Sequence, residues 1–232
     1  MSRLSQDQIK ARLGEKAASF IVSGMKVGLG SGSTSHCFIK SLAKRCNEEN
    51  IQITGAASSQ VSAELAKSLG LQIIDVDKIG FLDITVDGAD EVDPQNRLIK
   101  GAGGAHVREK IVATMSKELL IIVDETKLVD QLGKAKLPIE ILPFGHEVTK
   151  AHIEKAGYKG LFRKKGNSLY LTDNGNYILD IEFKAPLENP TICEKDILKI
   201  PGVIDTGFFF HLASRVLVGF TDGQIVEKSP IR

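Results

Sequence analysis

Apolar residues in the first 125 positions alternate between a helical and an extended rhythm. Spacing of three and four residues predicts four helices, with apolar faces from Ile9 to Phe20, 38 to 43, 61 to 69 and 107 to 115. Short apolar runs predict strands at 27–29, 51–54, 71–76, 82–86 and 119–123. Ser5 is a candidate cap for the first helix, and Gly24 a candidate end. This order favours an α/β fold with a mostly parallel, doubly wound sheet that carries helices on both faces.

The pattern changes near residue 130. Prolines flank a predicted strand at 137–143, helices are predicted at 148–156 and 192–200, and short strands at 161–163 and 168–172. Asn174-Gly175 predicts a type I′ hairpin turn, which needs positive φ at both central residues. Strand patterns return between 208 and 226. We therefore expect an α/β domain from residues 1–132 plus 206–232, with residues 133–205 inserted as a smaller α+β domain.

Composition narrows the class of protein. The 232 residues carry 30 Lys+Arg and 29 Asp+Glu, a net charge of +1, which argues against a nucleic-acid binder that relies on a basic field. No apolar run approaches the ~18 residues of a membrane span, and the charged N-terminus does not resemble a signal peptide. Cys37, Cys46 and Cys193 lack CxxC spacing, so we expect reduced thiols and a cytoplasmic protein without membrane partners.

A glycine-rich segment follows the first predicted strand. It reads Gly28-Leu29-Gly30-Ser31-Gly32-Ser33-Thr34 and leads into the next helix, so free N–H groups at the helix start would attract an anion. It is not a P-loop, because the lysine is missing, and Ser33 occupies the place of the third glycine of a dinucleotide fingerprint. The segment indicates either a phosphate site or a purely structural turn.

Acidic residues follow a later predicted strand. Asp87-Gly88-Ala89-Asp90-Glu91 begins where the strand at 82–86 ends, and Asp93 lies just beyond. Ligands of open α/β sheets bind at this edge. The carboxylates suit proton transfer, hydrogen bonds to a polyol, or a divalent cation, and the alternative is a solvated acidic turn.

A second glycine-rich loop is led by a lysine. It reads Lys100-Gly101-Ala102-Gly103-Gly104-Ala105 and enters a helix on which Glu109 lies about one turn from the start. A carboxylate and an ammonium in one closed site supply a proton acceptor and a stabiliser of negative charge. Glu109 could instead be a surface residue paired with Lys110. Lys127, after another strand, is a second candidate cation, and the five histidines lack metal-site spacing.

Taken together, these motifs resemble the type A ribose-5-phosphate isomerase family. The resemblance rests on their order along nearly the whole chain, including Arg108-Glu109-Lys110, 127–133, 172–176 and Ile200-Pro201-Gly202-Val203. It implies a Rossmann-like α/β domain with a small ferredoxin-like domain, assembled as a homodimer or homotetramer. It also implies interconversion of D-ribose 5-phosphate and D-ribulose 5-phosphate in the non-oxidative pentose phosphate pathway, with no metal or organic cofactor.

The resemblance also assigns the site. Glu109 matches the proton acceptor of the family, and we add Asp87, Asp90 and Lys100 as catalytic residues. The expected substrate contacts are Ser31, Gly32, Ser33, Thr34, Asp87, Gly88, Ala89, Asp90, Lys100, Gly101, Ala102, Gly103 and Lys127. In this hypothesis Glu109 moves a proton between C2 and C1 through a cis-enediolate that Lys100 and loop N–H groups stabilise. Asp87 shuttles hydroxyl protons or assists ring opening, Asp90 holds sugar hydroxyls, and the loop Ser31–Thr34 binds the phosphate with Lys10 or Lys127 beside it.

Three other functions remain open at this point. An amino-sugar-phosphate deaminase/isomerase would use a similar anion loop. A non-catalytic sugar-phosphate sensor would need that loop but no base such as Glu109. A metal-dependent hydrolase could use Asp87, Asp90 and Asp93, and would lose activity in EDTA.

Overall fold

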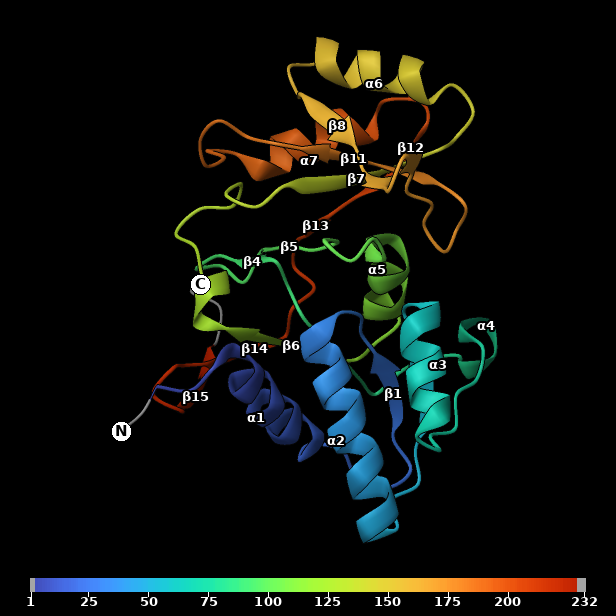
Figure 1. The fold of residues 1–232 in the computed structure, drawn as a ribbon, viewed down its shortest axis with the longest axis vertical. Coiled ribbons are helices and arrows are strands. Elements are labelled where there is room, and N and C mark those ends of the chain that lie inside the picture. Colours follow the sequence, from blue (N-terminus) through green and yellow to red (C-terminus); the bar gives the residue numbers. More distant parts are fainter. Residues whose placement is uncertain (1–2, 229–232) are drawn as a thin grey trace.

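A six-stranded sheet forms the lower half of the molecule (Figure 1). The computed structural model describes residues 3–228, and its strand order is β15-β14-β6-β3-β1-β2. Five neighbouring strands are parallel and β15 is an antiparallel edge, so the predicted mostly parallel sheet is confirmed. The elements of this part are α1 (Gln6–Ala18), β1 (Lys26–Leu29), α2 (Ser33–Glu49), β2 (Thr54–Ala57), α3 (Gln60–Ser68), α4 (Val76–Ile79), β3 (Ile84–Asp87), β4 (Glu91–Val92), β5 (Leu98–Ile99), α5 (His106–Thr114), β6 (Leu119–Asp124), the 3₁₀ helix η1 (Glu125–Lys127), β13 (Phe208–Phe209), β14 (Arg215–Gly219) and β15 (Ile225–Lys228).

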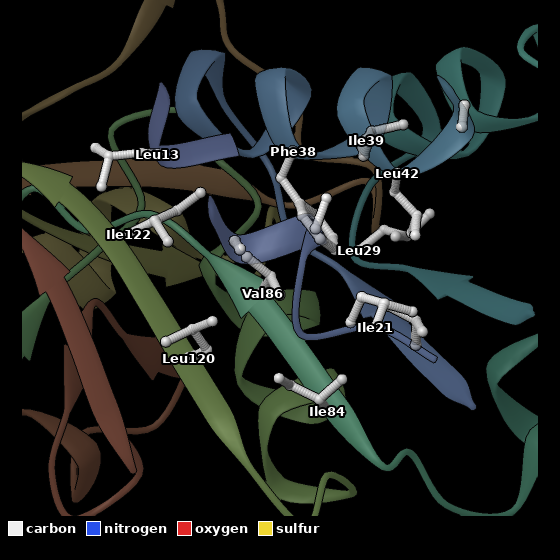
Figure 2. Close-up of a cluster of buried hydrophobic side chains, with 14 of the residues drawn as sticks. Leu13, Ile21, Leu29, Phe38, Ile39, Leu42, Ile84, Val86, Leu120 and Ile122 are labelled. Carbon is white, nitrogen blue, oxygen red and sulfur yellow. The ribbon is translucent and has the colours of Figure 1, made fainter. Parts of the chain in front are cut away.

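Apolar side chains cover both faces of this sheet. Figure 2 shows Phe38 of α2 directed towards Leu29 of the sheet, and Leu13 of α1 lying near Ile122; all four side chains are buried. Each contributes about 1.5–3 kcal/mol by leaving water. On the opposite face, α5 and a short antiparallel sheet, β13-β5-β4, bury a second cluster around Phe209. The expected arrangement with helices on both faces is therefore present.

A smaller unit occupies the upper half of Figure 1. Its antiparallel sheet has the order β12-β7-β11-β8. The chain order βαββαβ with strand order 4-1-3-2 is ferredoxin-like, as expected, and Ile153 and Ile197 attach the two helices to the sheet. The elements are β7 (Leu137–Ile141), α6 (His146–Lys155), β8 (Gly160–Phe162), β9 (Lys164–Lys165), β10 (Ser168–Leu169), β11 (Tyr177–Ile181), α7 (Pro190–Leu198) and β12 (Val203–Thr206).

Several local predictions were wrong. The strand predicted at 51–54 lies at Thr54–Ala57, and the strand predicted at 71–76 is reduced to one bridge between Gly55 and Ile73. A Cβ on Gly55 would lie 2.7 Å from Ile73 Cδ1, so glycine at this position of β2 permits the packing of Ile73. The helix capped by Ser5 is confirmed, but it ends at Ala18 rather than near Gly24.

The turn at Asn174-Gly175 also differs from the prediction. Gly175 has φ 76°, but Asn174 keeps a negative φ, so the turn is not type I′. The N–H of Gly175 donates to the carbonyl of Thr172 over 2.9 Å, which makes a wider turn with glycine at its left-handed position. Across residues 3–228, no helix has both the length and the apolar character that a membrane span requires.

The strand order determines where a ligand can reach the sheet. After β1 the chain passes to β2 on one side, and then returns to form β3 on the other side of β1. Such a switch point leaves a crevice at the carboxyl ends of the parallel strands. The segments that leave β1, β3 and β6 at that edge contain Ser31–Thr34, Asp87–Asp90 and Lys127.

Candidate active site

The loop after β1 presents backbone N–H groups at the start of α2. Helix α2 begins at Ser33, and the N–H groups of its first turn have no acceptor within the helix. No side chain caps them either. Gly32 makes the turn with φ 90°, a conformation that L side chains rarely adopt. Gly30 is required for a different reason, since a Cβ there would lie 2.1 Å from Asp87 Oδ1. The loop therefore presents N–H donors of the kind that bind an anion, next to the end of β3.

Asp87 is buried at the end of β3. Its Oδ1 accepts hydrogen bonds from Ser31 N (3.0 Å), Ser35 Oγ (3.0 Å) and Gly88 N (2.8 Å). Its Oδ2 lies 3.0 Å from Lys100 Nζ. Asp87 thus links the anion loop to the lysine of the second glycine-rich loop.

Lys100 lies at the centre of the charged group. Its side chain is 3% exposed, and Nζ donates to the carbonyl of Gly88 over 2.6 Å. Nζ also lies 3.2 Å from Glu109 Oε2. Burial disfavours the ammonium, but Asp87 and Glu109 outweigh burial and raise the pKa of Lys100. Lys100 therefore stays charged inside the protein.

Glu109 faces Lys100 from the first turn of α5 and is 5% exposed. Burial raises its pKa to about 8; the charge of Lys100 opposes this and that of Asp87 adds to it. Oε2 makes an ionic contact with Lys100 but no hydrogen bond of good geometry. A carboxylate in this state is a stronger proton acceptor than one in water.

These groups surround a cavity of about 250 Å³. The expected residues that line it are Ser31, Gly32, Ser33, Thr34, Gly88, Ala89, Asp90, Lys100, Gly101, Ala102, Gly103, Glu109 and Lys127. Asp87 does not line the cavity, but it contacts Lys100, which does. Lys10 reaches the cavity from α1, so both candidate phosphate lysines are present.

Some lining residues were missed from the sequence. Gln6 of α1 lines the cavity, as do Asp124 at the end of β6 and Thr126 in η1. Asp124 could have been predicted from the sequence, since it ends a buried strand at the same edge as Asp87. Asp93 is not part of the site, because it turns back to pair with Arg97 at 2.5 Å. The three carboxylates of the hydrolase alternative therefore do not converge.

A larger hollow of about 840 Å³ lies elsewhere. Val92, Leu128 and Phe183 are among its lining residues, and it contains none of the expected catalytic side chains. Size alone does not identify the site; the buried charged cluster distinguishes the smaller cavity.

Sequence comparison agrees with this geometry. The family model described as "Ribose 5-phosphate isomerase A (phosphoriboisomerase A)" matches residues 54–223. The chain belongs to this family. A family member from Oceanobacillus iheyensis, named ribose-5-phosphate isomerase A 1, is 46% identical over 96% of this chain and 99% of its own length.

Solved structures of the family share the whole fold. A ribose 5-phosphate isomerase from Plasmodium falciparum superposes with a TM-score of 0.93 at 33% identity, covering 97% of this chain and 100% of the other. A D-ribose-5-phosphate isomerase in complex with phospho-erythronic acid gives 0.92 at 35% identity, with the same coverage. The family fold therefore includes both the parallel sheet and the ferredoxin-like unit.

Proposed function

We propose that this chain interconverts D-ribose 5-phosphate and D-ribulose 5-phosphate. The observation that carries the proposal is the buried Glu109–Lys100 pair, 3.2 Å apart, in the same cavity as a helix N-terminal anion loop. One end of the cavity suits a phosphate, and the other suits proton transfer at a carbon next to a carbonyl. Family membership supports the same reaction.

The phosphate would bind at the start of α2. The N–H groups of Gly32 to Thr34 and the hydroxyls of Ser33 and Thr34 are donors there, and Lys10 and Lys127 line the same cavity. The volume of about 250 Å³ is below the ~300–1,000 Å³ of sites for drug-sized ligands, so it suits a short sugar chain. The relative bound to phospho-erythronic acid supports this substrate class, since that compound joins a phosphate to a short hydroxylated chain.

Glu109 would carry the proton. Its carboxylate removes the proton from C2 of the open-chain aldose, and the C–H electrons form the C1–C2 double bond of a cis-enediolate. The C1 carbonyl electrons move onto its oxygen, and the proton of the C2 hydroxyl passes to that oxygen. Returning the carbon-bound proton to C1 then gives the ketose, so one base serves both half-reactions. The ammonium of Lys100 and N–H groups of its loop stabilise the negative oxygen.

Asp87 and Asp90 would have different roles. The contacts of Asp87 with Lys100, Ser31 and Ser35 favour a role in orienting the cation and the anion loop rather than direct contact with the sugar. Asp90 lines the cavity and accepts from the N–H of Ala102 over 2.9 Å, so its free carboxylate oxygen can bind a sugar hydroxyl.

Turnover of ribose 5-phosphate by the purified protein in excess EDTA tests the proposal. We expect ribulose 5-phosphate to form at an undiminished rate with the chelator. Turnover of glucosamine 6-phosphate instead would favour the deaminase alternative. Binding of ribose 5-phosphate without turnover would favour the sensor, and loss of activity in EDTA would favour a metal enzyme.

We further propose a cytoplasmic homodimer or homotetramer whose chain divides at 1–132 plus 206–232 and 133–205. Residues 137–206 carry every strand of the β12-β7-β11-β8 sheet, which supports this division. Light scattering would give the number of subunits, and limited proteolysis would test whether cleavage falls near residues 133 and 206.

A further inference from the structure

The ferredoxin-like unit holds the outer side of the substrate loop at 101–103. Arg163 follows β8, and its Nη1 donates to the carbonyls of Gly101 (3.1 Å) and Ala102 (2.9 Å). Tyr170 follows β10 and donates from its hydroxyl to the carbonyl of Gly103 over 3.3 Å. Three successive carbonyls of the loop are therefore bound by two side chains of this unit.

Arg163 is itself fixed in place. Its Nε donates to Asp180 Oδ2 over 2.9 Å, and its Nη2 donates to Asp180 Oδ1 over 2.5 Å. This two-point contact orients the planar guanidinium, and both side chains are largely buried, at 18% and 14% exposed. Asp180 lies on β11, inside the four-stranded sheet. Through Asp180 and Arg163, the sheet of the smaller unit therefore fixes the position of the loop at 101–103.

The contacts with the carbonyls determine where the opposite N–H groups point. In a planar trans peptide the C=O and the N–H of the next residue point in opposite directions. The carbonyl of Gly101 accepts from Arg163 and from the N–H of Gly104 (2.9 Å), and the N–H of Ala102 on the opposite side of that peptide donates to Asp90. Holding the carbonyl of Ala102 directs the N–H of Gly103 inwards, and among residues 3–228 that N–H has no acceptor.

We propose that Arg163 is a positioning residue for the isomerase reaction: through the two peptide groups between Gly101 and Gly103, it aims their N–H groups at Asp90 and at the enediolate oxygen. This inference rests on the proposed function. No residue between 137 and 206 lines the cavity in the described part of the chain. The ferredoxin-like unit therefore acts on the reaction through the loop at 101–103 and not by contact with the substrate. Figure 1 shows the segment between β5 and α5 lying between the two units.

The kinetic test compares Arg163→Gln, Arg163→Lys and the control Lys165→Gln. Lys165 is an exposed residue of neighbouring β9. We expect Arg163→Gln to lower kcat about 10- to 100-fold, because a misplaced donor is lost in the transition state. KM should stay within about threefold, because Arg163 binds Asp180, Gly101 and Ala102 and none of the phosphate donors at Gly32 to Thr34. Lysine should not restore kcat, since one ammonium cannot span two carbonyls and Asp180.

Hydrogen exchange tests the same inference without substrate. In Arg163→Gln the amides of Ala102 and Gly104, which donate to Asp90 and to the Gly101 carbonyl, should exchange faster than in the wild type, whereas in Lys165→Gln they should not. If Arg163→Gln does not fold, Tyr170→Phe replaces it, and we expect about a two- to fivefold lower kcat with unchanged KM.

Three results would overturn the inference: an unchanged kcat in Arg163→Gln, full recovery by lysine, or unchanged exchange at Ala102 and Gly104. A wild-type protein without ribose 5-phosphate turnover would instead refute the proposed function, and the exchange experiment would still report on the loop.

Discussion

Replacing Glu109 by Gln separates the cost of burying this carboxylate from its use in catalysis. Glutamine keeps the size of the side chain but neither ionises nor accepts a proton at neutral pH. Glu109 lies beside Lys100 and Asp87, and the Lys100–Asp87 contact survives the change. The substitution should therefore raise the free energy of unfolding, because no buried carboxylate has to ionise, and lower turnover, because the base is lost.

The size of the stability effect follows from the pKa of Glu109. The pKa is about 8 in the folded protein, against 4.5 for a solvated glutamate. Between these values the folded state binds the proton more tightly, so the free energy of unfolding of the wild type falls as pH rises, by about 5 kcal/mol in all. Glu109→Gln lacks this loss. Its stability relative to the wild type should increase from pH 5 to pH 9 and level off above about pH 8.

Urea unfolding at pH 5, 7 and 9 measures the difference in the free energy of unfolding between the variant and the wild type. Glu64→Gln, at an exposed position of α3, is the control. Turnover by Glu109→Gln should fall about 10²- to 10⁴-fold, and wild-type kcat/KM should rise with pH through a pKa near 8 as the base ionises. A stability difference that is constant with pH would contradict the burial argument. Near-normal turnover by folded Glu109→Gln would remove it as the base.

Three further substitutions test the surroundings of the base. Lys100→Met leaves Asp87 and Glu109 buried without their cationic partner, so we expect the free energy of unfolding measured in urea to fall by about 3–5 kcal/mol. Gly104→Ala places a Cβ 2.6 Å from the Tyr170 hydroxyl at φ 84°, and should lower kcat about tenfold or more in a steady-state assay. Lys127→Ala should raise KM for ribose 5-phosphate about tenfold with kcat retained, and a fall in kcat instead would place Lys127 at the reacting carbons.

Residues of the candidate site were predictable because each lies at the end of a strand or in the first turn of a helix. Asp87 ends β3, Ser33 begins α2, and Glu109 lies one turn into α5, so local pattern and the edge rule for parallel sheets brought them together. The strand at Thr54–Ala57 was not predictable in the same way. Its residues are small, and Gly55 leaves room for Ile73, whereas the apolar residues Ile51 and Ile53 precede the strand.

The contacts that hold the loop at 101–103 join residues that are distant in sequence. Arg163 and Tyr170 lie some sixty residues after the carbonyls they bind, and nothing near them in the chain marks those partners. The same holds for Arg108, which donates to the carbonyl of Asp173 over 2.7 Å. Sequence patterns report the neighbours of a residue along the chain; contacts between two units depend on how both fold.

Strand β14 has a consequence for biosynthesis. It pairs in parallel with β6, whose six residues are all buried, but Arg215–Gly219 is translated only after the whole ferredoxin-like unit. A ribosome adds about 5–20 residues per second, so the edge of β6 waits on the order of 5–20 s for its partner. An exposed apolar strand edge is prone to aggregation during that interval. Nascent chains that stall between residues 124 and 215 should therefore be the aggregation-prone species, and chaperone binding should concentrate there.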